Sequence, residues 1–186
     1  MDIDTLSRIP LFSSVPSTSL EKILDISIKK SYQKDTILYY ENDKENFIYY
    51  LLSGSVKIFK VDRLDNEVFL YNVGKNSFIS ELTSFDSIGC FASAIFLEDS
   101  EVLKIDYERF RQVLRGDCIL LERVFEAFIK QVKSLQCIIN REIVFDGSAK
   151  VAHLLDTDLD FFNSSKRQDI AHLLNIQPET LSRILK

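Results

Sequence analysis

Residues 165–186 read SKRQDIAHLLNIQPETLSRILK, and this stretch predicts two short helices joined by a tight turn. Apolar side chains recur in it at helical spacing on both sides of one asparagine, at Ile170, Leu174, Ile176, Leu181 and Ile184. The small Ala171 lies where two helices must approach closely, and Asn175 is the residue type that best tolerates a positive φ after glycine. Pro178 suits the first position of a second helix, and Glu179 suits its positive end. The pattern is that of a helix-turn-helix, whose second helix enters the major groove of DNA.

The charge of this closing segment differs from that of the chain as a whole. The 186 residues carry a formal net charge of −5. Residues 164–186 carry four basic side chains against two acidic ones, a local charge of +2, from Lys166, Arg167, Arg183 and Lys186 against Asp169 and Glu179. Phosphate attraction acts locally, so an acidic protein can present a basic face to double-stranded DNA. An ordinary helical hairpin in a small helical domain is the alternative interpretation.

The composition predicts a cytoplasmic chain without a metal centre. The three cysteines, Cys90, Cys118 and Cys137, are widely spaced and form no CxxC pair, which is typical of reduced thiols. His153 and His172 are the two histidines, too few for a usual zinc site. The first residues lack the pattern of a signal peptide, and the apolar runs are too short to span a membrane.

Residues 1–115 predict a β-rich domain. Runs rich in Val, Ile, Phe and Tyr alternate with turn residues, as TILYYE, NFIYYLLSG, SVKIFKVD, EVFLYNVG, FASAIFLED and EVLKID. Short strands at even spacing are typical of a sandwich or a jelly-roll barrel, so we expect an α+β protein with an N-terminal jelly-roll β-barrel. A metal-dependent enzyme on such a barrel would need clustered histidines, and this zone contains none. The chain is therefore not expected to be an enzyme.

Residues 116–146 predict a long helix with an apolar seam. Six side chains follow the 4-3 spacing of a coiled coil, namely Leu121, Phe125, Phe128, Val132, Leu135 and Ile139. The seam predicts a homodimer, whereas the alternative is a stripe packed on the chain's own barrel. Gly147 and Ser148 are expected to break this helix, and residues 147–186 would form the DNA-binding domain.

Three stretches resemble the catabolite-activator/fumarate-nitrate-regulator (Crp/Fnr) superfamily of bacterial transcription factors. FIYYLLSGSVKIFK (47–60) is similar to an early hairpin of that family, and LEDSEVLKID (97–106) to the strands before its long helix. RQDIAHLLNIQPETLSRIL (167–185) resembles its DNA-reading region and is the most specific of the three. The resemblance implies a sensing barrel, a dimerisation helix, a helix-turn-helix, and RNA polymerase as a further partner.

The resemblance also assigns roles to individual residues. Its base-reading positions are Glu179, Thr180, Ser182 and Arg183, and its phosphate contacts are Lys166, Arg167 and Gln168. Serine within ETLSR resembles the fumarate-nitrate branch, whose half-sites read TTGAT, so a TTGAT-like palindrome is the expected site.

The expected effector pocket departs from the cyclic-nucleotide binders of the family. Their cassette reads Gly-Glu-Leu, a loop, then Arg-Ser/Thr-Ala. Here Ser80 replaces the glycine before Glu81 and Leu82, while Cys90 and Phe91 replace the arginine and the hydroxyl residue. A buried phosphate needs a bidentate cation, so the departure argues against cAMP. No cysteine precedes residue 90, which argues against an iron–sulfur cluster. Haem, another small effector, or no effector remain open.

The resemblance thus implies a dimeric, sequence-specific DNA-binding regulator that responds to an effector other than cAMP, with a hinge at residues 146–148. Members of the family usually continue past the recognition helix into a β-hairpin wing, whereas this sequence stops at Lys186. The wing is thus missing from the expected fold, and we interpret the DNA-binding domain as truncated. The alternative function is a cyclic-nucleotide-binding-like sensor or a protein-interaction module with disabled DNA binding.

Overall fold

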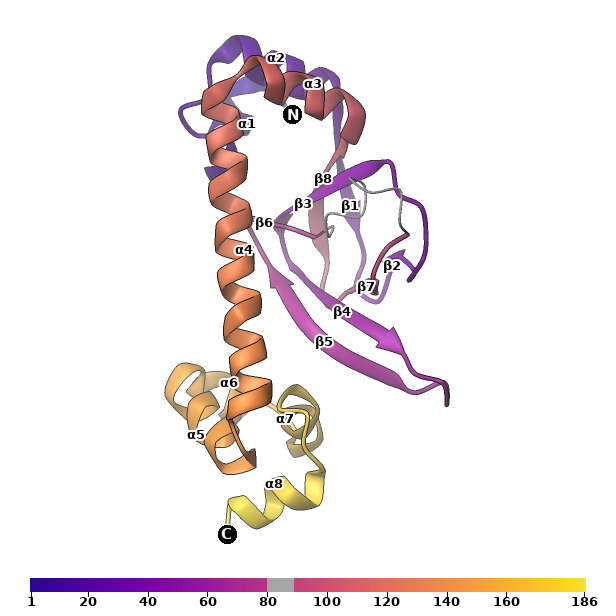
Figure 1. Cartoon of the computed structure of the whole chain (residues 1–186), viewed down its shortest axis with the longest axis vertical. Helices are drawn as coiled ribbons and strands as arrows, with labels where there is room; N and C mark the ends of the chain where they lie inside the picture. The colour runs from indigo at the N-terminus through magenta and orange to yellow at the C-terminus, as the bar shows by residue number, and fades with distance from the viewer. Residues whose placement is uncertain (80–88) are drawn as a thin grey trace. The chain divides into compact units, whose positions relative to one another are not determined.

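The computed structural model describes residues 1–79 and 89–186, together with all their side chains except those of Arg141 and His172 (Figure 1). The chain divides into two compact units, Met1–Val132 and Lys133–Lys186. The change of unit falls inside the long helix α4 (Cys118–Val144). The division at residues 115 and 146 that the sequence suggests stays a prediction.

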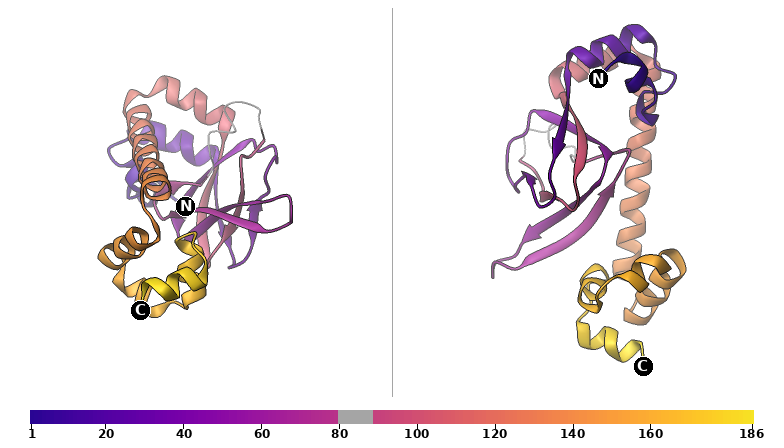
Figure 2. Two further views of the ribbon diagram at one scale, coloured as in Figure 1. Left: turned by 60° about the horizontal axis from the view of Figure 1, so that its bottom comes forward. Right: turned by 180° about the vertical axis from the view of Figure 1, so that it is seen from behind.

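The first unit contains a β-sandwich of two antiparallel, four-stranded sheets. One sheet has the order β1 (Ser27–Tyr32), β8 (Ser100–Asp106), β3 (Phe47–Ser53), β6 (Ser77–Phe78). The other has the order β2 (Ile37–Tyr39), β7 (Ser93–Phe96), β4 (Ser55–Val61), β5 (Glu67–Gly74). Most strands that follow one another in the sequence lie in different sheets. Such crossing between two sheets is compatible with the Greek keys of a jelly roll. The β4–β5 hairpin extends well beyond its neighbours (Figure 2).

The strands predicted from apolar runs are confirmed as β2, β3, β4, β5, β7 and β8. The sequence reading missed β1 and the two-residue β6. β1 reads SIKKSY and has no apolar alternation, because it is an edge strand with most side chains exposed. Its charged residues Lys29 and Lys30 suit an edge, since charge there prevents pairing with another chain.

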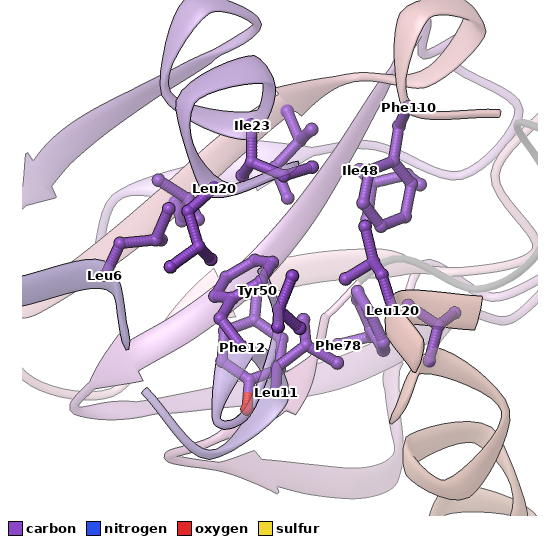
Figure 3. Packing of buried hydrophobic residues seen from close by; sticks show 14 of the residues in the cluster. Leu6, Leu11, Phe12, Leu20, Ile23, Ile48, Tyr50, Phe78, Phe110 and Leu120 are labelled. Atoms are coloured by element: carbon purple, nitrogen blue, oxygen red, sulfur yellow. The ribbon is translucent and has the colours of Figure 1, made fainter. Parts of the chain in front are cut away.

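β3 is apolar throughout because both of its faces are covered. Successive side chains of a strand point to opposite faces. Tyr49 and Leu51 pack between the two sheets, whereas Ile48 and Tyr50 pack against the helical layer. That layer consists of α1 (Ile3–Ser7), η1 (Pro10–Phe12), α2 (Ser17–Asp25) and α3 (Tyr107–Gly116). Figure 3 shows Tyr50 and Phe78 meeting leucines and phenylalanines of these helices.

The start of α4 is fixed to this helical layer. Asp117 precedes the helix, and its Oδ1 accepts a hydrogen bond from the backbone N–H of Leu120 at 2.9 Å. Its Oδ2 accepts a hydrogen bond from the Ser19 hydroxyl on α2. About three turns further along α4, the Phe128 ring stacks on Phe78 with centroids 5.0 Å apart. The first half of α4 is therefore held by a polar cap and an aromatic stack.

Replacing Asp117 with alanine is expected to lower the free energy of unfolding at pH 7 by about 1–2 kcal/mol, the cost of a lost helix cap and a lost hydrogen bond. The bonds from Ser19 and Leu120 hold the pKa of the Asp117 carboxyl below its ordinary value. A carboxylate whose pKa is lower in the folded than in the unfolded state stabilises the fold at pH values above the unfolded pKa of about 3.9. This stabilisation is lost as the pH falls through the folded-state pKa. Urea unfolding at pH 7 and pH 3 measures this, with Asp156→Ala, an exposed aspartate on α5, as the control. An Asp117→Ala deficit of equal size at both pH values would contradict a role for the charge.

The second unit is a small helical group with its own core. It holds the end of α4 together with α5 (Gly147–Thr157), α6 (Leu159–Ser164), α7 (Arg167–Leu173) and α8 (Pro178–Ile184). Its buried side chains are Val151, Leu154, Ile170, Ala171, Leu174 and Leu181. The sequence reading missed α6, whose first turn is capped by Asp158 accepting from the N–H of Phe161 at 3.0 Å.

The junction between α4 and α5 differs in detail from the expected break. α4 ends at Val144, and Gly147 already belongs to α5. Asp146 is the N-cap of α5, because its Oδ1 accepts from the N–H of Ala149 at 2.8 Å. The break therefore lies at residues 145 and 146 rather than at Gly147 and Ser148. The Asp146 carboxylate explains this difference, because an N-cap begins a helix at the position where Gly147 alone had suggested a loop.

Candidate nucleic-acid interface

The turn between α7 and α8 has the geometry that its sequence predicts. Asn175 has φ 50°, and the backbone N–H of Ile176 donates to the carbonyl of Ala171 at 3.0 Å. These are the left-handed residue and the closing bond of a common helix terminus. Pro178 stands at the start of α8. Ala171 and Leu181 are buried, at 1% and 0% exposure, so the two helices are tied through their inner faces.

The predicted phosphate contacts lie together at the start of α7. Lys166, Arg167 and Gln168 are all exposed. Arg167 is the first residue of the helix, and Lys166 precedes it. Their side chains are therefore accessible to solvent at the N-terminal end of α7.

The predicted base-reading residues divide into two groups on α8. Glu179 and Arg183 are exposed and one helical turn apart, with the half-buried Ser182 beside Arg183. Thr180 is also half-buried, and its methyl carbon lies 3.6 Å from the position that a Cβ on Gly147 would occupy. The structure thus brings Glu179, Ser182 and Arg183 to one side, while the Thr180 methyl faces α5.

The apolar seam of α4 has two sides. Leu121, Phe125, Val132 and Ile139 are between 48% and 63% exposed. Phe128 and Leu135 are half-buried, and Phe128 packs on the sandwich. Packing on the chain's own sandwich therefore holds for Phe128, whereas the dimer seam stays a prediction for the exposed residues. The sequence reading missed Ile143, which is 78% exposed and follows Ile139 by one turn on the same side.

The expected effector pocket is only partly described. Ser80, Glu81 and Leu82 lie outside the described residues. Cys90 is buried between the sheets, whereas the Phe91 ring is 56% exposed and lies 4.0 Å from the ammonium of Lys60. One side chain is buried and the other exposed, so the structure does not bring Cys90 and Phe91 together.

Backbone contacts hold Cys90 in place. Its N–H donates to the carbonyl of Asp43 at 2.8 Å, and its carbonyl accepts from the N–H of Asn42 at 2.7 Å. Gly89 passes so close to Asn42 that a Cβ would lie 2.3 Å from the Asn42 oxygen. Only a residue without a side chain fits this approach.

Two tyrosines that the sequence reading did not select, Tyr39 and Tyr49, are packed between the sheets. The Tyr39 hydroxyl donates to the carbonyl of Ile79 at 3.1 Å, and the Tyr49 hydroxyl donates to Glu45 at 2.8 Å. Burial and the Glu45 carboxylate raise the pKa of Tyr49 well above its ordinary value, so the phenol is neutral. The ammonium of Lys104 lies 3.7 Å from the centroid of the Phe47 ring at the same sheet. This inner face offers neutral hydroxyls and aromatic rings.

Residues 29–117 match the cyclic nucleotide-binding domain family. The chain is 24% identical over 173 residues to the cAMP-activated global transcriptional regulator CRP of Salmonella typhimurium, covering 83% of this chain and 79% of the relative. Its fold is similar to that of the c-di-GMP responsive regulator CLP of Xanthomonas campestris, with a TM-score of 0.70 and 21% identity over 91% of this chain and 90% of the other. A putative Crp/Fnr-family regulator of Eubacterium rectale matches with a TM-score of 0.71 and 17% identity, covering 95% and 84% of the two chains. The chain is a distant homologue of the Crp/Fnr transcription regulators.

Similarity to the Crp/Fnr regulators agrees with two of the sequence expectations. The fold is a cyclic-nucleotide-binding-like sandwich followed by a long helix and further helices. The named relatives are transcription regulators and not enzymes, as expected for this chain. The two named ligands differ between relatives, because CRP is called cAMP-activated and CLP c-di-GMP responsive.

Two kinds of feature are absent from the described part of this chain. Within residues 1–79 and 89–186 no three His, Cys, Asp or Glu side chains gather as metal ligands do. Over the same residues, none of the helices combines the length and the apolar character needed to cross a bilayer.

Proposed function

We propose that this Crp/Fnr regulator is a homodimer that binds a TTGAT-like palindrome through α8 and responds to an effector other than cAMP. The observation that carries the proposal is the exposed surface of the helix-turn-helix. Glu179 and Arg183 stand one turn apart on α8, while Lys166 and Arg167 are exposed at the start of α7. This arrangement fits a helix that lies in a major groove. An acidic and a basic side chain on α8 would contact base edges, and the cations at α7 would contact phosphates.

Each side chain has a chemical counterpart in such a site. The Arg183 guanidinium can donate two hydrogen bonds to a guanine, and the Glu179 carboxylate can accept one from a cytosine amine. Ser182 lies beside Arg183 and can bond to a neighbouring base edge. Lys166, Arg167 and Gln168 would contact phosphates, which position the helix without reading the sequence. Thr180 is the weakest of the proposed readers because its methyl group faces α5.

A palindromic site requires two copies of α8. The exposed apolar stripe of α4 supports the dimer, because an apolar patch of this kind marks a contact surface. Two helices joined along Leu121, Phe125, Val132 and Ile139 would present the recognition helices to two half-sites. RNA polymerase is the partner that we expect for a bound regulator.

The effector proposal rests on the departures in the cassette. Cys90 and Phe91 supply no guanidinium where the cyclic-nucleotide binders have arginine, and desolvated phosphate requires one. Relatives with different named ligands show that membership alone leaves the effector open. The uncharged tyrosines and aromatic rings between the sheets favour a small, largely apolar effector, and haem remains a candidate. An iron–sulfur cluster is not favoured, since no cysteine precedes Cys90.

Fluorescence anisotropy tests the proposal with a labelled TTGAT-N4-ATCAA duplex and a scrambled duplex at two salt concentrations. We expect a preference for the palindrome of about 100-fold or more, because each mismatched base pair costs about 1–3 kcal/mol. Affinity for both duplexes should fall with salt, with a slope near 0.9 for each phosphate neutralised. Equal, weak binding to both duplexes would contradict the proposal and favour the alternative, a sensor or interaction module with disabled DNA binding.

A further inference from the structure

Residues 145 and 146 separate α4 from α5, and side-chain contacts connect the segments before and after this junction. The Lys150 ammonium on α5 lies 2.5 Å from the Glu142 carboxylate on α4. The Phe145 ring meets His153 edge to face, with centroids 5.5 Å apart. Asp146 caps the first turn of α5. The junction is therefore fastened by an ion pair, a ring contact and a helix cap.

The ion pair depends on the angle between the two helices. Glu142 and Lys150 are eight residues apart and lie on different helices, so their contact links the end of α4 to the first turn of α5. The Lys150 side chain is only 7% exposed, and that of Glu142 is 29% exposed. A buried ammonium without a charged partner is strongly unfavourable, so the partner is needed where the lysine lies.

The first turn of α5 also touches the recognition helix. A Cβ on Gly147 would lie 3.2 Å from the Cδ1 of Ile184 and 3.6 Å from the Cγ2 of Thr180. Both of those residues belong to α8. The backbone of α5 is thus in close contact with the inner side of α8, and a change in the direction of α5 moves α8 with it.

We propose that Lys150 is a positioning residue. Its ion pair with Glu142 sets the angle at which α5 leaves α4, and the Gly147 contact transmits this angle to α8. In a dimer joined along α4, the angle would determine which spacing between two half-sites the protein accepts. This inference rests on the proposed function. It assigns to residues 142–153 a junction that is held by side-chain contacts, where the sequence suggests a hinge.

The test is the spacing preference of Lys150→Met in the full-length chain. Methionine fills a similar volume without a charge, so the fold is expected to persist. Binding is measured to palindromes whose half-sites are three, four, five or six base pairs apart, and to a single half-site. Wild type should prefer one spacing by about tenfold or more, because two recognition helices held at one angle match one half-site separation. Lys150→Met should lose that preference and keep its affinity for the single half-site.

Two further variants separate positioning from general damage. Glu142→Gln should weaken the preference in the same direction, since it removes the other charge of the pair. Lys133→Met is the matched control, because Lys133 is an exposed lysine on α4. It should behave as wild type. If Lys150→Met unfolds, Glu142→Gln carries the test alone.

Lys150→Met or Glu142→Gln with an unchanged spacing preference would overturn the inference. If wild type binds no duplex, the proposed function fails, and the joint is tested by hydrogen exchange instead. Amides of residues 149–151 should then exchange about tenfold faster in Lys150→Met than in Lys133→Met if the pair fastens α5. Equal exchange rates would overturn the inference without reference to DNA.

Discussion

Arg183→Ala is expected to abolish the preference for a TTGAT palindrome over a scrambled duplex. A bidentate contact to guanine contributes about 1–3 kcal/mol of discrimination, and a dimer makes it twice, so the palindrome should lose about 2–6 kcal/mol. Arg183 is exposed on α8, while the buried contacts of that helix are made by Leu181. The substitution should therefore leave the free energy of unfolding within about 0.5 kcal/mol of wild type. Anisotropy with both duplexes measures the first effect, and urea unfolding checks the second.

The matched control for Arg183 is Lys166→Ala. A phosphate contact carries no sequence information, so this change should weaken binding to both duplexes equally and reduce the salt slope by about 1 for each phosphate lost. Arg183→Ala should instead change the ratio of the two affinities. If Arg183→Ala and Lys166→Ala both reduce the two affinities alike, α8 does not read bases through Arg183.

Val132→Asp is expected to convert the protein to a monomer and to remove most of its affinity for the palindrome. Val132 is 52% exposed at the middle of the α4 stripe, so aspartate is harmless in a monomer and costly in an apolar interface. Loss of the second recognition helix removes the gain from linked binding, which is about 10²–10⁴-fold. Sedimentation velocity measures the mass, and anisotropy measures the affinity.

Lys130→Asp is the matched control on the same helix. Lys130 is exposed and two residues from Val132, which places it on the opposite side of α4. It should remain dimeric. A dimer that persists in Val132→Asp would show that the α4 stripe is not the interface, and a monomeric wild type would show the same.

Several elements were predictable because their signals are local. The turn at Asn175 follows from its tolerance of a positive φ, and the start of α8 follows from Pro178. The central strands follow from β-branched and aromatic runs between turn residues. β1 was not predicted because an edge strand has little apolar surface to bury. α6 was not predicted because its six residues are too few to show a helical period.

The long helix shows where a correct pattern was not sufficient. It carries more apolar residues than one coiled-coil seam requires. Periodicity alone therefore does not show which face of the helix packs on the sandwich. Phe128 packs on Phe78, a residue fifty positions earlier in the chain, while Phe125 stays 63% exposed. The distinction depends on contacts between segments that are distant in sequence.

The sequence by itself determined the local parts of this Crp/Fnr-like chain: the order of the central strands and of the longer helices, the helix-turn-helix pattern with its basic residues, and the cassette without arginine. These depend on residue type and short spacing, which act through the backbone and nearest neighbours. Only the tertiary structure decided that Cys90 points inward and Phe91 outward, and that Lys150 is buried against Glu142. Burial and pairing of this kind arise when separate elements pack together, because a side chain's surroundings are supplied mostly by residues far from it along the chain.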